Sequence, residues 1–245
     1  MNKTKIEYVD YTWNPITGCY HNCPYCYARR IAERFKSKQN YAYINGVKPA
    51  HIKEPFPYGF RPTYHPDRLE EPLKVVVPSR ILVCSMGDIM GEWVPDEWIR
   101  SVIEVTRKCP QHTFLFLTKN PQRYFFFKDE FPDNCWLGAS ITTNEQTVQN
   151  PDGSFIVTSA HTIADTMSFF KHSFLSIEPL LNNIAEDLPI AGIDWIIVGG
   201  QTGPNAVKPE DEWIENLINL CEEAGVPIFL KNNLNWKIKI QQIPF

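Results

Sequence analysis

The amino-acid sequence predicts an α/β protein, built as a partial or nearly closed parallel β/α barrel of TIM type with about six to seven strands. Short apolar runs recur from residue 80 onward, and helical patterns lie between them. The length of 245 residues suits one such barrel, and an apolar content of 43% is sufficient for a large core. We therefore expect a single domain over residues 1–245.

The expected strands are near-continuous apolar runs of roughly four to seven residues, which is typical of parallel strands buried on both faces. None of them alternates apolar with polar residues, as a half-exposed strand would. Their number favours a barrel, and a doubly wound open sheet is the structural alternative. The runs lie near residues 11–17, 80–86, 113–119, 135–142, 173–181, 194–200 and 227–231.

Helical patterns separate these runs, as βαβ units require. The segment 95–108 begins with Pro, Asp and Glu, which favour a first helical turn, and repeats apolar residues on one face. The segment 210–225 has the same design, and Gly225 suits a C-cap. A weaker helix is expected within 155–170.

Residues 37–79 interrupt this alternation with a stretch rich in proline and tyrosine. An insertion of this length inside a compact domain is commonly a lid or a binding loop. The alternative is an extended segment that its aromatic side chains strap onto the barrel. The sequence leaves both interpretations open.

The charge is distributed unevenly along the chain. Residues 1–80 carry 13 basic and 7 acidic side chains, a formal charge of +6, whereas residues 81–245 carry −10. A basic N-terminal third could attract an anionic partner such as nucleic acid, and an ordinary solvated surface is the alternative.

No signal-peptide core and no run of about 20 apolar residues is found, so we expect a cytoplasmic protein without a membrane segment. Thiols stay reduced in that compartment, and the odd number of seven cysteines argues against a disulfide framework. Free cysteines in apolar contexts behave as small core residues. We expect this of Cys84, Cys109, Cys135 and Cys221.

Cys19, Cys23 and Cys26 lie within eight residues, directly before a helical pattern. A structural zinc site needs four ligands, and His21 is the nearest candidate for the fourth. A thioredoxin-like CxxC would leave Cys19 unexplained. A 4Fe–4S cluster held by three thiolates would leave one iron open to a substrate or cofactor. The spacing favours this third interpretation.

The pattern C-x3-C-x2-C, with Tyr25 before the last cysteine, resembles the signature loop of the radical SAM superfamily. More closely, the chain resembles an uncharacterised, largely phage- and prokaryote-borne family of radical-SAM-like proteins, from residue 10 to residue 232. The segments that carry this resemblance are TWNPITGC, CPYCYA, LVCSMGDIM, FLFLTKNPQR, LSIEPLL and DWIIVGGQTGP.

The resemblance implies that Cys19, Cys23 and Cys26 hold a 4Fe–4S cluster and that S-adenosylmethionine (SAM) chelates its open iron. An electron from a reductase or flavodoxin-type donor would cleave SAM to a 5′-deoxyadenosyl radical, which abstracts a hydrogen atom. It also implies a Gly-Gly-Glu-like stretch that holds the SAM amino group. Gly87 and Asp88 stand at that place and could serve it.

Further SAM contacts are expected at the carboxyl ends of later strands, where function concentrates in parallel barrels. The alternative is that every strand ends in a polar group as it meets solvent. The candidates are Tyr25 beside bound SAM, Ser140 and Thr142 at the ribose, Glu178 facing the pocket, and Gly199, Gly200 and Gln201 near a ligand such as adenine.

The leading hypothesis is therefore a radical SAM enzyme whose catalytic residues are unknown. Its substrate is a nucleic acid or nucleotide on one interpretation, and a peptide or small metabolite on the other. The competing functions are a zinc-stabilised nucleic-acid-binding protein and a non-catalytic iron–sulfur barrel protein. The sequence leaves the oligomeric state open.

Overall fold

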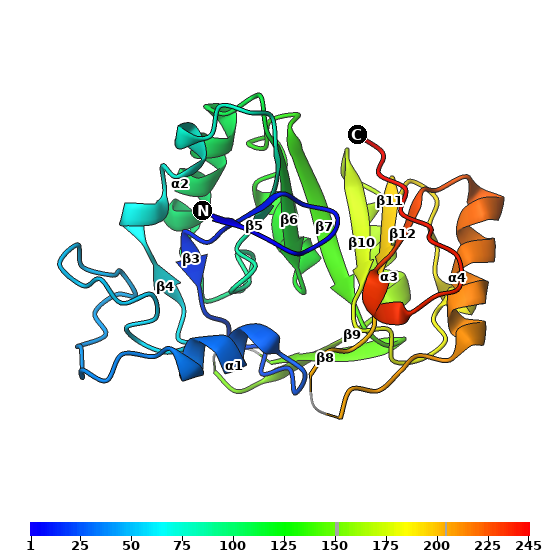
Figure 1. Ribbon diagram of the computed structural model, residues 1–245, viewed down its shortest axis with the longest axis horizontal. Coiled ribbons are helices and arrows are strands. Elements are labelled where there is room, and N and C mark those ends of the chain that lie inside the picture. Colours follow the sequence, from blue (N-terminus) through cyan, green and yellow to red (C-terminus); the bar gives the residue numbers. More distant parts are fainter. Residues whose placement is uncertain (150–151, 204) are drawn as a thin grey trace. The chain divides into compact units, whose positions relative to one another are not determined.

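The computed structural model describes residues 1–149, 152–203 and 205–245 (Figure 1). The described chain forms two compact units. The first contains residues 1–117, 126–135, 149 and 152–154, and the second contains residues 118–125, 136–148 and most of the chain from 155 to 245. The single domain that the sequence predicts stays a prediction.

Eight strands belong to one mostly parallel sheet, which confirms the α/β class. β1 runs antiparallel to β2, and the other paired neighbours within each unit are parallel. The order follows the chain without the reversal that a doubly wound sheet shows, so the barrel-type interpretation is supported. The strands are, in order, β1 (Asn2–Lys3), β2 (Tyr11–Trp13), β5 (Arg80–Val83), β6 (Thr113–Thr118), β7 (Cys135–Ile141), β10 (Ser173–Ile177), β11 (Trp195–Val198) and β12 (Ile228–Leu230).

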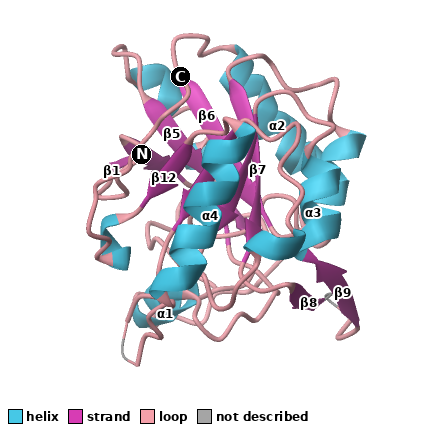
Figure 2. Ribbon diagram, turned by 90° about the vertical axis from the view of Figure 1, so that its right-hand side faces the viewer, coloured by secondary structure: helices cyan, strands magenta, loops and turns pink. Residues whose placement is uncertain are grey.

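All seven expected strands are present among these elements, and their apolar runs are buried. The run 11–17 divides at Pro15, which lacks a backbone donor, into β2 and β3 (Ile16–Thr17). β3 pairs antiparallel with β4 (Thr63–Tyr64). β8 (Glu145–Gln149) and β9 (Phe155–Ser159) pair in a two-stranded sheet that the sequence does not predict (Figure 2).

The helices lie where the sequence places them. α4 ends at Ala224, and the left-handed φ of 67° at Gly225 confirms the expected C-cap. In Figure 1, α4 lies beside β11 and β12 of the second unit. Among the described residues, no helix has the length and apolar content that crossing a membrane requires. The helices are α1 (Tyr27–Arg34), α2 (Asp96–Arg107), α3 (Ala160–Met167) and α4 (Asp211–Ala224).

The insertion 37–79 packs against the rest of the first unit through its aromatic side chains. Tyr64 stacks on Trp98 of α2 with ring centroids 5.3 Å apart, and its hydroxyl lies 3.0 Å from Oγ of Ser101. Nε1 of Trp13 donates to the carbonyl of Arg68 at 2.8 Å. These contacts favour the interpretation of residues 37–79 as an extended segment packed on the rest of the unit over their interpretation as a lid or binding loop.

His65, which follows β4, makes the stability of the fold sensitive to acid. Burial lowers its pKa to about 2, and the charges of Arg68 and Lys48 act in the same direction. The unfolded chain binds this proton below about pH 6.5, so the free energy of unfolding falls by up to about 1.4 kcal/mol per pH unit below that value.

The variant His65→Gln should remove this pH dependence of the free energy of unfolding, because glutamine does not titrate. It keeps a hydrogen-bonding group for Oγ1 of Thr17, which lies 2.9 Å from Nε2 of His65. Between pH 7 and pH 5 we expect the wild type to lose about 2 kcal/mol more stability than the variant. Urea unfolding at both pH values measures this difference. Equal losses would contradict the assignment.

Candidate functional site

The loop between β3 and α1 begins at Gly18, where the backbone is closely surrounded. Its N–H donates to the carbonyl of Met86 at 2.8 Å, and Gly18 and Gly87 form a parallel bridge. Any other residue at position 18 would place its Cβ only 2.3 Å from the carbonyl oxygen of Arg61 and would have to adopt the left-handed φ of +87°. Only glycine therefore fits at this position. This bridge fixes the cysteine loop beside the segment that follows β5.

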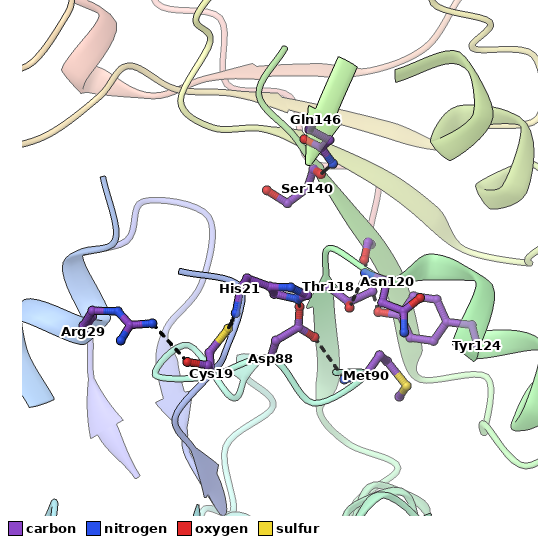
Figure 3. A network of polar contacts seen from close by, with 11 residues as sticks. Cys19, His21, Arg29, Asp88, Met90, Thr118, Asn120, Tyr124, Ser140 and Gln146 are labelled. Carbon is purple, nitrogen blue, oxygen red and sulfur yellow. Dashed lines mark hydrogen bonds and ion pairs between the residues drawn. The ribbon is translucent and has the colours of Figure 1, made fainter. Parts of the chain in front are cut away.

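Backbone N–H groups point at the sulfurs of Cys19 and Cys26, and Figure 3 shows the contact at Cys19. The N–H of His21 donates to Sγ of Cys19 at 3.4 Å. The N–H of Arg29 donates to Sγ of Cys26 at 3.3 Å, so Cys26 is the N-cap of α1. Nη2 of Arg29 also donates to the carbonyl of Cys19 at 3.3 Å. Hydrogen bonds of this kind stabilise thiolates and tune iron–sulfur clusters.

The three thiols influence one another electrostatically. Burial raises the pKa of Cys19 well above its usual value, and the charges of Asp88, Cys23 and Cys26 add to this increase. Cys19 and Cys26 also pack on one apolar cluster that includes Phe60. The three side chains therefore belong to one small region of the first unit.

The thiols do not surround the position of a single ion. Within the part of the chain that the structure describes, no group of three or more His, Cys, Asp and Glu side chains could hold one metal ion. By contrast, the remaining four cysteines are buried, which confirms that they are core residues.

Asp88 lies beside the cysteine loop, and its role toward SAM stays a prediction. Its carboxylate is buried, Oδ2 accepts from Nε2 of His21 at 2.8 Å, and Oδ1 accepts from the N–H of Met90 at 3.0 Å (Figure 3). His21, the candidate fourth zinc ligand, thus directs Nε2 to Asp88. Sequence reasoning missed this pair because 67 residues separate its members.

Two tyrosines flank Cys26. Tyr25, expected beside SAM, is half-buried. The hydroxyl of Tyr27 donates to the carbonyl of Ser85 at 2.7 Å, which adds a second link from the cysteine loop to the segment after β5. No sequence pattern predicts this role of Tyr27.

The candidate ribose contacts of the second unit are joined by a side chain that sequence analysis missed. Oε1 of Gln146 accepts from N–H and Oγ1 of Thr142 at 3.2 and 3.3 Å. Nε2 of Gln146 donates to the carbonyl of Ser140 at 3.0 Å (Figure 3). All three residues are buried. Gln146 lies in β8, so an unpredicted element brings it to this position.

Glu178 forms an ion pair in the second unit. Its Oε2 accepts from Nζ of Lys231 at 2.6 Å, and its Oε1 accepts from Oγ of Ser176 at 3.3 Å. Lys231 follows β12 directly, as Glu178 follows β10. Gly199 lies so close that a Cβ there would be 2.9 Å from Cγ and Oε2 of Glu178.

The side-chain amide of Asn233 holds the backbone at Gly200, after β11. The N–H of Gly200 donates to Oδ1 of Asn233 at 3.1 Å, and Nδ2 of Asn233 donates back to the carbonyl of Gly200 at 2.7 Å. Oε1 of Gln201 accepts from the N–H of Val207 at 3.2 Å. Asn233 was also missed, because a single asparagine after a strand carries no spacing signal.

The predicted site residues therefore lie in two sets, and their roles toward SAM stay predictions. The first unit holds Cys19, Cys23, Tyr25, Cys26, Gly87 and Asp88. The second unit holds Ser140, Thr142, Glu178, Gly199, Gly200 and Gln201.

The close approach at Gly199 gives a prediction. The variant Gly199→Ala should push Glu178 away from Lys231 and lower the free energy of unfolding by about 1–3 kcal/mol. Gly200→Ala is the matched control, because its Cβ would make a milder contact, 3.3 Å from the carbonyl oxygen of Asn233. Urea unfolding of both variants measures the difference. An equal effect at the two glycines would contradict the contact.

Comparison with known proteins identifies a family and a fold. The family described as "Protein of unknown function (DUF5131)" matches residues 3–242, and no curated protein matches the chain. Spore photoproduct lyase complexed with dinucleoside spore photoproduct has a similar structure, with a TM-score of 0.59 and 11% identity over 94% of this chain and 78% of that one.

A mutant of the same lyase, with bound AdoMet and dinucleoside spore photoproduct, matches with a TM-score of 0.52 and 12% identity. That match covers 94% of this chain and 57% of the mutant chain. At these identities the likeness establishes the fold alone. A phage association stays a prediction. Because the family match covers nearly the whole chain, this protein belongs to the family described as "Protein of unknown function (DUF5131)".

Proposed function

We propose that this protein is a radical SAM enzyme in which Cys19, Cys23 and Cys26 hold a 4Fe–4S cluster. The observation that supports this proposal most strongly is a set of three thiols in one loop, with backbone N–H groups that donate to the sulfurs of Cys19 and Cys26. When bound, the cluster and SAM supply reductive cleavage of the sulfonium C–S bond, giving methionine and a 5′-deoxyadenosyl radical that takes a hydrogen atom from the substrate.

The residues present fit this cofactor better than they fit zinc. Three thiolates match a cluster that leaves one iron without a protein ligand, whereas structural zinc needs four ligands. The donor set therefore supports a centre with an open coordination position.

The chain's own residues would bind and orient SAM. Asp88 would accept a charge-assisted hydrogen bond from the SAM ammonium group. The contacts of Asp88 with His21 and with the N–H of Met90 would hold its carboxylate in place for this role. Gly87 would let the backbone approach the ligand. Ser140, Thr142, Glu178, Gly199, Gly200, Gln201 and Tyr25 keep their predicted role as further contacts.

We propose a nucleic acid or nucleotide as the substrate class. Two observations support it: the fold is similar to that of a lyase solved with a dinucleoside photoproduct, and residues 1–80 carry a formal charge of +6. The electron would come from a flavodoxin-type donor or a reductase.

The test of the reaction is performed on the whole chain without oxygen. After reconstitution we expect about four iron and four sulfide per chain. Addition of dithionite and SAM should then yield 5′-deoxyadenosine, measured by liquid chromatography. One bound zinc and no iron would overturn the proposal. A full cluster that cleaves no SAM would instead indicate a non-catalytic iron–sulfur protein.

The substrate class has a separate test. If the radical abstracts hydrogen from DNA, deuterated DNA should place deuterium in the 5′-deoxyadenosine product, which mass spectrometry detects. A deuterated peptide library is the comparison. Deuterium transfer from the peptides and none from DNA would contradict a nucleic-acid substrate without affecting the SAM chemistry.

A further inference from the structure

His21 and Asp88 form a buried pair. The proposed function gives Asp88 a role in binding SAM but gives His21 none. Their side chains are 4% and 7% exposed, and Nε2 lies 2.8 Å from Oδ2. A buried carboxylate that loses a hydrogen-bond donor bears a large desolvation penalty. The orientation of Asp88 therefore depends on the imidazole of His21.

The imidazole itself is held in place by a ring contact. The indole of Trp93 meets it edge to face, with centroids 4.8 Å apart and an interplanar angle of 73°. Its other nitrogen, Nδ1, is buried and has no hydrogen-bond partner among the residues that the structure describes. Nε2 is thus the ring atom that supplies the hydrogen bond to Asp88.

The backbone of the same residue contacts the cysteine loop. The N–H of His21 donates to Sγ of Cys19 at 3.4 Å. A second connection joins Gly18 to Gly87, which directly precede Cys19 and Asp88. The loop and the acidic segment are therefore linked through the backbone and also through the side chain of His21, whose contact with Asp88 is drawn in Figure 3.

We propose that His21 is a positioning residue that aligns the carboxylate of Asp88 with the SAM ammonium group and ties this alignment to Cys19. The inference rests on the proposed function, because it assumes that SAM binds beside the cysteine loop. His21 acts through Asp88 and does not itself contact SAM or iron. Its role is to supply a donor at the position of Nε2.

Two substitutions separate the two ring nitrogens. His21→Gln reaches as far as Nε2 and can still donate to Asp88, whereas His21→Asn ends near Nδ1 and leaves Asp88 without that donor. Equilibrium dialysis on the anaerobically reconstituted chain measures the dissociation constant of SAM. We expect His21→Asn to weaken SAM binding by about 10- to 100-fold, the value of one charge-assisted hydrogen bond. His21→Gln should stay within about threefold of the wild type.

Iron content and thermal unfolding distinguish positioning from a general structural role. Both variants should keep the iron content of the wild type, because all three thiols remain. His51→Asn is the matched control, since His51 is exposed in the same unit and the change is the same. Loss of iron in parallel with loss of SAM binding would assign His21 a structural role and overturn the inference.

The outcomes separate the two proposals. Wild-type protein that loads a cluster but binds no SAM contradicts the proposed function and the inference together. Wild-type protein that binds SAM, with His21→Asn binding equally well, contradicts the inference alone. If His21→Asn does not fold, His21→Gln decides: binding within about threefold supports positioning through Nε2, and a loss of tenfold or more overturns it.

Discussion

Replacement of any one of Cys19, Cys23 or Cys26 by alanine is expected to reduce the reconstituted iron from about four per chain to less than one. Two thiolates leave two corners of the cluster exposed, and the three side chains belong to one small region with no spare cysteine in the loop. The measurement is colorimetric iron and sulfide analysis after anaerobic reconstitution, together with the visible absorbance of the cluster.

Cys109→Ala is the matched control for these variants. Cys109 is fully buried in the first unit, and burial raises the pKa of its thiol, so it should bind no iron. Its replacement should keep full iron and full 5′-deoxyadenosine formation. If the variants at positions 19, 23 and 26 retained iron as Cys109→Ala does, the trio could not be the ligand set.

Gly18→Ala is expected to cause the largest loss of stability in the first unit, about 3 to 5 kcal/mol. Its Cβ would be 2.3 and 2.4 Å from the carbonyl oxygen and carbon of Arg61 and 2.6 Å from the nitrogen of Pro62. These are backbone atoms of the insertion, so no side-chain rotation relieves the overlap. Because Cys19 follows directly, the cysteine loop should move and iron loading should fall as well.

The control for Gly18→Ala is Gly153→Ala, which has the same φ of +87° but no atom within 4 Å of the added Cβ. It isolates the backbone strain of the left-handed conformation, which costs about 1 kcal/mol. Urea unfolding of both variants gives the difference. Similar losses at the two positions would show that the close approach of residues 61–62 to Gly18 contributes nothing.

The sequence predicted the central sheet because its strands are buried on both faces and read as uninterrupted apolar runs. It could not predict β1 and β4, which are two residues long and carry no periodicity. The β8–β9 hairpin was missed for another reason: the described residues of β9 are exposed or half-buried, so its pattern gives no sign of a buried face.

The cysteine trio and Asp88 could be found from the sequence because a local spacing and the end of a strand mark them. The His21–Asp88 pair could not, since two single polar residues far apart in the chain give no signal until the fold places them together. Gln146 illustrates the same limit, because its contacts with Ser140 and Thr142 depend on the turn between β7 and β8.

The central claim is an iron that lacks a protein ligand and accepts SAM. Mössbauer spectroscopy of protein reconstituted with ⁵⁷Fe, recorded before and after SAM is added, tests it directly. We predict that the signal of one iron site changes on SAM addition while the other three stay unchanged. Spectra that are identical with and without SAM, from a fully loaded cluster, would contradict the account.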